Sequence, residues 1–196
     1  DNGRVLFSPM QHMQRPGLLL MNGLLYIAFG SHGDFDPYHG WVFAYEAATL
    51  KRRGVFCATP GGAKAGIWQA GEGPVGDGSG NVYFGSGNGD SNANAVGGPN
   101  LGQSFVRLRA GAASLDLDAF ETIPQDATHP IFDEDLGAAS PTLLPDGFLV
   151  GGGKDGNFYL LDPSKMIHAG NGGSVVQRFR GDVGDRTVGE DSFDQD

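Results

Sequence analysis

Short apolar runs separated by turn residues recur along the chain, and three of these units are built alike. Each has a turn of Asn, Asp, Ser or Gly residues, then a short β-rich apolar run, then a glycine. The three units are residues 22–30, 79–85 and 146–151. An apolar or small-residue run precedes each turn, and two runs joined by Asn-Gly or Asp-Gly are the strongest short-range signal for a β-hairpin. Asn22-Gly23 and Asp146-Gly147 match that signal directly and predict hairpins.

Two further apolar runs follow each hairpin, so each repeat contains four predicted strands. The third strands are expected at residues 41–45, 105–108 and 158–161, and the fourth at 54–57, 115–120 and 175–179. Antiparallel strands with local turns form a meander, and meanders arranged radially form a β-propeller. We therefore predict an all-β fold, a propeller segment of about three four-stranded antiparallel blades at about residues 15–60, 64–122 and 136–180. The run Val5-Leu6-Phe7 is predicted to be the outer strand of a preceding blade.

A β-sandwich is the alternative fold, because it also has short strands at regular spacing. A sandwich does not, however, require a glycine at the end of every second strand. Three blades cannot close a ring, since propellers usually have ~4–8 blades. We expect a larger ring of about seven or eight blades, with the remaining blades in the same or another chain. Residues 181–196 are rich in charge and poor in apolar side chains, so we expect a mobile tail or linker there.

The composition excludes several classes of protein. Among 196 residues there are 34 Gly and 11 Pro, which argues against helical bundles, while 39% hydrophobic residues supply a core. The net charge of −10 argues against a nucleic-acid partner, because phosphate binding needs clustered Lys and Arg. The one basic cluster, Lys51-Arg52-Arg53, is interpreted as the exposed start of a strand. The longest apolar runs are far shorter than the ~20 residues of a membrane span.

The location and redox state of the protein are only weakly constrained. Cys57 is the single cysteine, so no disulfide can form within the chain, and its expected role is that of a buried small hydrophobe. The chain begins at Asp1 without an initiator methionine, so either a leader was removed or the chain is a piece of something longer. Because the acidic charge suits an exported protein, a periplasmic or extracellular location is expected.

Several segments resemble the repeat of pyrroloquinoline-quinone-type (PQQ-like) propellers. That repeat runs as an apolar strand, a glycine, a short loop, and a strand that ends in an acidic residue and a turn. The matching segments are residues 25–30, 40–50, 66–71, 80–89 and 154–163. The resemblance implies a propeller fold, and the family includes quinoprotein dehydrogenases and scaffold proteins. The chain departs from the dehydrogenases because it has no Thr-Gly-Lys-Trp blade signature, no vicinal cysteine pair and no haem-attachment motif.

The resemblance also implies cofactors, which are pyrroloquinoline quinone and Ca²⁺. In quinoprotein relatives a channel-facing Trp stacks on the flat cofactor, and Trp68 is the residue that could do so here. Glu72 would then be a channel carboxylate. The alternative is that Trp68 packs between blades and that Glu72 is merely solvated.

The loop of residues 31–40 is the best candidate for a site at the channel mouth. It carries two imidazoles and two carboxylates, from His32, Asp34, Asp36 and His39. Such a set could bind a divalent metal, with Asp34 and Asp36 as ligands, or could supply a base near neutral pH. A turn rich in Gly and Asp also uses its carboxylates to bond its own backbone, which needs no ligand. The residues of the loop are compatible with both interpretations.

Two functions of different class follow. The first is a quinoprotein-like oxidoreductase acting on alcohols or sugars, with a catalytic residue that the sequence does not identify. The second is a non-catalytic binding or scaffold propeller for a protein or glycan partner. A third hypothesis is a propeller lyase or hydrolase that uses His and Tyr38 with a metal.

Overall fold

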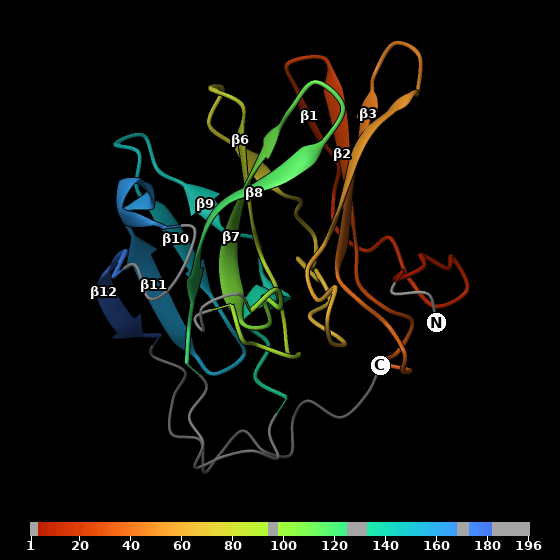
Figure 1. The fold of residues 1–196 in the computed structure, drawn as a ribbon. Helices are drawn as coiled ribbons and strands as arrows, with labels where there is room; N and C mark the ends of the chain where they lie inside the picture. Colours follow the sequence, from red (N-terminus) through yellow and green to blue (C-terminus); the bar gives the residue numbers. More distant parts are fainter. Residues whose placement is uncertain (1–3, 94–97, 125–132, 168–172, 182–196) are drawn as a thin grey trace.

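The chain folds into three four-stranded antiparallel sheets that stand side by side (Figure 1). The computed structural model describes residues 4–93, 98–124, 133–167 and 173–181. The strands of the first sheet are β1 (Leu19–Met21), β2 (Leu24–Phe29), β3 (Trp41–Glu46) and β4 (Arg52–Cys57). Those of the second are β5 (Val75–Gly76), β6 (Asn81–Gly85), β7 (Ser104–Ala110) and β8 (Leu115–Thr122). Those of the third are β9 (Thr142–Leu143), β10 (Leu149–Gly152), β11 (Asn157–Leu161) and β12 (Val175–Arg180).

Helical structure in the described residues is limited to two 3-10 turns, η1 (Leu136–Ala138) and η2 (Pro163–Lys165). Within the same residues, no helix has the length and apolar character needed to cross a membrane. The prediction of an all-β fold is therefore confirmed.

Local turn chemistry explains the first hairpin. Asn22 and Gly23 both have positive φ, 52° and 75°, and Met21 pairs with Leu24 across them. Only residues that tolerate left-handed backbone fit such a two-residue turn, which is why Asn-Gly serves there. Gly147, at the corresponding turn of the third sheet, has φ 89°.

The sheets pack face to face around their inner strands, as the blades of a propeller do. In each sheet the strands follow in sequence order, and β5 contacts both β1 and β9. All five residues of β6 are buried, because Val82 and Phe84 face the first sheet while Tyr83 faces the third. A middle sheet that is buried on both faces excludes a two-sheet sandwich. The prediction of three four-stranded blades is confirmed.

Two apolar cores lie between the blades. The first joins Tyr26 and Val42 of blade 1 to blade 2, where Phe56 and Phe84 make an edge contact with centroids 6.0 Å apart. The second joins blades 2 and 3, where the Phe105 and Tyr159 rings lie 6.2 Å apart. Each blade is thus stabilised mainly by its neighbours, as in other repeat architectures.

Arginine side chains also link consecutive blades. Arg53 of blade 1 pairs with Glu46 at 2.9 Å and donates to the Ala112 carbonyl oxygen of blade 2. Arg107 of blade 2 pairs with Asp118 and donates to a carbonyl oxygen in the third blade, that of Pro163, at 2.6 Å. The same arrangement therefore occurs at both blade contacts.

The prediction of a strand at Val5-Leu6-Phe7 is wrong, because residues 4–8 form no strand. The Phe7 ring instead packs against Phe29, Trp41 and Phe43, with centroids 4.8 to 6.0 Å away. The hydrophobicity of Phe7 therefore reflects packing on the outer face of blade 1 rather than sheet pairing, while Leu6 is exposed. Of the predicted tail, residues 182–196 lie outside the described part of the chain.

A buried histidine fixes this N-terminal segment on blade 1. His12 is 3% exposed, and its Nδ1 donates to the Ser8 carbonyl oxygen at 2.8 Å. Its Nε2 accepts from the Trp41 indole N–H at 3.1 Å and from the His39 backbone N–H at 3.2 Å. Burial lowers the pKa of His12 below its ordinary value, more than the bond to Ser8 raises it. The ring is therefore neutral in the folded protein near pH 7.

We expect the free energy of unfolding to fall as the pH drops below about 6.5, the usual pKa of an unfolded histidine. Above that pH His12 is neutral in both the folded and the unfolded state, so its protonation does not lower the free energy of unfolding. Below it the unfolded state binds a proton first, because burial lowers the pKa of His12 in the folded state. Urea unfolding midpoints at a series of pH values measure the effect.

The control for this experiment is a variant that lacks the buried imidazole. His12→Gln should flatten part of the pH dependence, because its side chain does not titrate in this pH range. His39 contributes in the same direction in every variant, since burial also lowers its pKa. Parallel pH curves for the native protein and His12→Gln would contradict the assignment.

Candidate functional site

Loops from all three blades meet at one end of the molecule. The loops between the second and third strands and the linkers between blades all open at that end, because the strands alternate in direction. They enclose a cavity of about 180 Å³, which we call the mouth cavity. Its polar and aromatic lining comes from Arg15, Ser31, Asp34, Trp68, Asp135 and Lys154.

Trp68 forms one wall of the mouth cavity and also seals the contact between blades. Its side chain is 7% exposed. A Cβ added at Gly30, Gly66 or Gly87 would lie 2.4 to 2.6 Å from an atom of the indole ring, so only glycine fits at these three positions. The ring is therefore closely covered by backbone, and little of it is free to stack on a ligand.

Asp135 accepts a hydrogen bond from the Trp68 indole. Its carboxylate accepts hydrogen bonds from the Trp68 Nε1–H at 3.2 Å, the Asn88 backbone N–H at 2.7 Å and the Lys154 ammonium at 2.9 Å. The residue is 4% exposed, and burial raises the pKa of its carboxyl above the ordinary value, more than Lys154 and Asn88 lower it. Lys154 also pairs with the more exposed carboxylate of Asp133.

Of the four predicted site residues in the loop of residues 31–40, Asp34 is the one that lines the mouth cavity. Its φ of 56° places it in the left-handed region, and its backbone N–H donates to the Ser31 hydroxyl oxygen at 3.0 Å. The Tyr38 hydroxyl donates to its carboxylate at 2.8 Å. Burial, with the carboxylate beside it, raises the pKa of Tyr38 far above its usual value, so that group stays protonated.

The other predicted site residues lie outside the mouth cavity. Asp36 is exposed and faces Lys64 at 3.6 Å, and His39 Nδ1 lies 3.0 Å from the Thr59 hydroxyl oxygen. His32 and Glu72 are exposed. The structure thus brings Asp34 and Trp68 together and leaves these four apart from them, and a functional role for the four stays a prediction.

The sequence does not place Asp135 and Lys154 in the same site as Trp68. Asp135 belongs to an acidic stretch, residues 133–135, that could hold Ca²⁺ through oxygen ligands or be a solvated loop, and Lys154 precedes an ordinary Asp-Gly turn. One signal could have pointed to Lys154. It lies in the loop between the second and third strands of blade 3, and Asp34 lies in the corresponding loop of blade 1. Nothing in the sequence pairs residue 135 with residue 68.

The described residues do not by themselves fit pyrroloquinoline quinone and Ca²⁺. No group of three or more His, Cys, Asp or Glu side chains in the described part of the chain is arranged to hold a metal ion. The mouth cavity is smaller than the ~300–1,000 Å³ typical of ligand pockets, and the Trp68 ring is covered. Cys57 offers no nucleophile either, because burial raises the pKa of its thiol to about 11.

Comparison with known proteins supports the fold. No family model matches the chain, and no curated protein matches it. Among solved structures, it is similar to a quinohemoprotein alcohol dehydrogenase from Pseudomonas putida HK5, with a TM-score of 0.56 and 20% identity. The match covers 80% of this chain and 27% of that chain.

This chain has the fold of a propeller segment, similar to part of the dehydrogenase structure. It spans about a quarter of the length of that dehydrogenase. The likeness at this identity extends to the fold, and the activity is a separate question.

Proposed function

We propose that this chain is part of a non-catalytic binding propeller whose mouth cavity holds a hydroxyl-rich ligand, such as one residue of a glycan. The observation that carries this proposal is the lining of the cavity, where cationic donors and carboxylate acceptors from blade 1, blade 3 and the linker between blades 2 and 3 face the same space. Sugar hydroxyls both donate and accept hydrogen bonds, so they suit such a mixed set. Trp68 is engaged in blade packing, which favours binding over quinone chemistry in this part of the ring.

The remaining blades of the ring, in the same or another chain, would enlarge the cavity. Phe158 and Phe179 support their presence, since the two rings stack at 5.5 Å on the outer face of blade 3 and are 41% and 43% exposed. Exposed paired aromatics of this kind mark a packing surface. On the outer face of blade 1, Phe7 packs against Phe29 and Phe43.

Saccharide binding with a matched pair of aspartate variants tests the proposal. Asp34→Asn should weaken binding about tenfold, because it replaces a charged hydrogen-bond acceptor in the cavity. Asp36→Asn, in the same loop but outside the cavity, should bind as the native chain does. Titration calorimetry with neutral mono- and disaccharides measures both. Equal affinities of the two variants, or no binding of any saccharide, would refute the proposal.

A quinoprotein-like oxidoreductase acting on alcohols or sugars is the second candidate function. It is favoured by the structural likeness to the alcohol dehydrogenase. In this case blades beyond this chain would supply the Ca²⁺ ligands and the stacking surface, and the protein would work in the periplasm or outside the cell. A thermal shift with pyrroloquinoline quinone and Ca²⁺, measured on the complete ring, separates this candidate from the first.

A further inference from the structure

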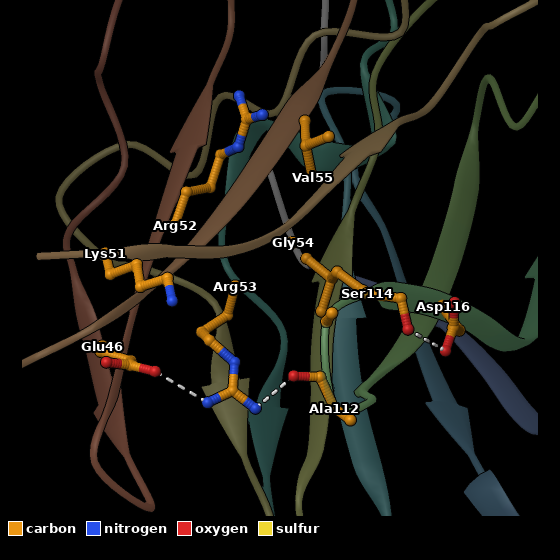
Figure 2. A pocket seen from close by; sticks show the side chains of 11 residues that line it. Glu46, Lys51, Arg52, Arg53, Gly54, Val55, Ala112, Ser114 and Asp116 are labelled. Carbon is orange, nitrogen blue, oxygen red and sulfur yellow. Dashed lines mark hydrogen bonds and ion pairs between the residues drawn. The ribbon is translucent and has the colours of Figure 1, made fainter.

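A second cavity lies at the opposite end of blades 1 and 2, between their outer hairpins. It has a volume of about 520 Å³ and is lined by the ends of β3 and β4 and by the turn between β7 and β8 (Figure 2). We call it the hairpin cavity. Its volume falls within the ~300–1,000 Å³ of ordinary ligand pockets, unlike that of the mouth cavity.

The three consecutive cations of the chain, Lys51, Arg52 and Arg53, all line the hairpin cavity. Arg53 is held in place, because it pairs with Glu46 and donates to the Ala112 carbonyl oxygen across the cavity (Figure 2). Its Nε is buried and has no hydrogen-bond partner in the described structure. Lys51 and Arg52 are exposed, and neither forms an ion pair within 4.0 Å among the described residues.

The carboxylates of the hairpin cavity do not neutralise these cations fully. Glu46 is engaged by Arg53, and the hydrogen bonds from Thr49 and Arg53 lower the pKa of its carboxyl. Asp116, on the far wall, accepts the Ser114 hydroxyl at 2.8 Å. The cavity therefore carries a net positive charge on a chain whose net charge is −10. An acidic ligand would be attracted to it rather than to the rest of the surface.

The backbone around the cavity can bind an extended chain. β4 is the outer strand of its sheet, and such an edge leaves N–H and C=O groups that are not used by the sheet. The Gly54 Cα sits directly against blade 2, where an added Cβ would lie 2.6 Å from the Leu115 nitrogen. Close-packed backbone therefore lines part of the cavity, together with the three cations.

We propose that the hairpin cavity binds an acidic peptide segment, with Lys51 and Arg52 pairing with its carboxylates beside the edge of β4. Peptides commonly bind to strand edges through their main chain, while side chains give specificity. Arg53 positions the wall of the cavity and is not free to contact the peptide. This surface is separate from the mouth cavity and does not depend on the function proposed for it.

Fluorescence anisotropy with a short labelled peptide of alternating glutamate and glycine residues tests this assignment. Replacing both Lys51→Met and Arg52→Gln should weaken binding about tenfold or more, because charge-assisted hydrogen bonds are lost. Asp116→Asn should tighten binding severalfold, because it removes an opposing charge while keeping an acceptor for Ser114. A peptide with glutamine in place of glutamate should bind far more weakly.

The control is a pair of substitutions with the same change in charge, Lys165→Met with Arg180→Gln, at exposed positions outside the cavity. It should bind as the native chain does. Equal weakening by the control pair, equal binding of the glutamine peptide, or no binding by the native chain would overturn the proposal. Should the Lys51 and Arg52 variant fail to fold, Asp116→Asn alone tests the proposal: tighter peptide binding supports it, and unchanged or weaker binding overturns it.

Discussion

Replacing Trp68 with alanine is expected to lower the free energy of unfolding by about 3–5 kcal/mol. The indole fills the space bounded by Gly30, Gly66 and Gly87, so its removal opens a cavity that glycine backbone cannot fill. It also removes one of the donors to the buried Asp135 carboxylate. Urea unfolding followed by circular dichroism measures the loss.

Trp68→Phe separates the packing of the ring from its hydrogen bond. The phenyl ring keeps much of the contact with the three glycines but loses the Nε1–H that Asp135 accepts. We expect a loss of about 1–2 kcal/mol, well below that of alanine. If alanine and phenylalanine destabilise equally, the hydrogen bond rather than the docking of the ring dominates. A loss under about 1 kcal/mol for alanine would show that Trp68 does not hold the blades together.

Replacing Asp135 with alanine is expected to lower the free energy of unfolding by about 3 kcal/mol. The Trp68 Nε1–H would then be buried without its acceptor, and the Asn88 N–H and the Lys154 ammonium would each lose a bond to the carboxylate. The loss of stability is large because one carboxylate bonds to Trp68, Asn88 and Lys154, which lie in separate segments of the chain. The same urea titration measures it.

Asp133→Ala is the matched control, because Asp133 pairs with the same ammonium group of Lys154. The Asp133 side chain is 60% exposed and that of Asp135 5%, so the exposed pair should contribute less than about 1 kcal/mol. Similar losses for the two variants would show that burial of Asp135 is not what makes its interactions strong.

The sequence predicted the strands well because their signals are local. A turn such as Asn22-Gly23 selects a hairpin from the backbone conformations of two residues, and each meander needs only contacts between neighbouring strands. The side chains of β6 likewise alternate between the first and third sheets, as the period of a strand requires. The local pattern failed at Phe7, because an apolar run that covers a sheet has the same composition as one that joins it.

The site could be predicted only in part, since its members meet through contacts between blades. The loop containing Asp34 was found because its residues are adjacent in the chain. The approach of Asp135 to Trp68, and of Arg53 to Ala112, depends on how one blade packs against the next.

The sequence by itself determined the repeat, the hairpins and the all-β class, because short-range backbone preferences and side-chain periodicity suffice for them. Tertiary structure alone decided which polar groups share a cavity and that the Trp68 ring packs between blades. Those outcomes depend on close contacts between residues far apart in the chain, which no local pattern encodes.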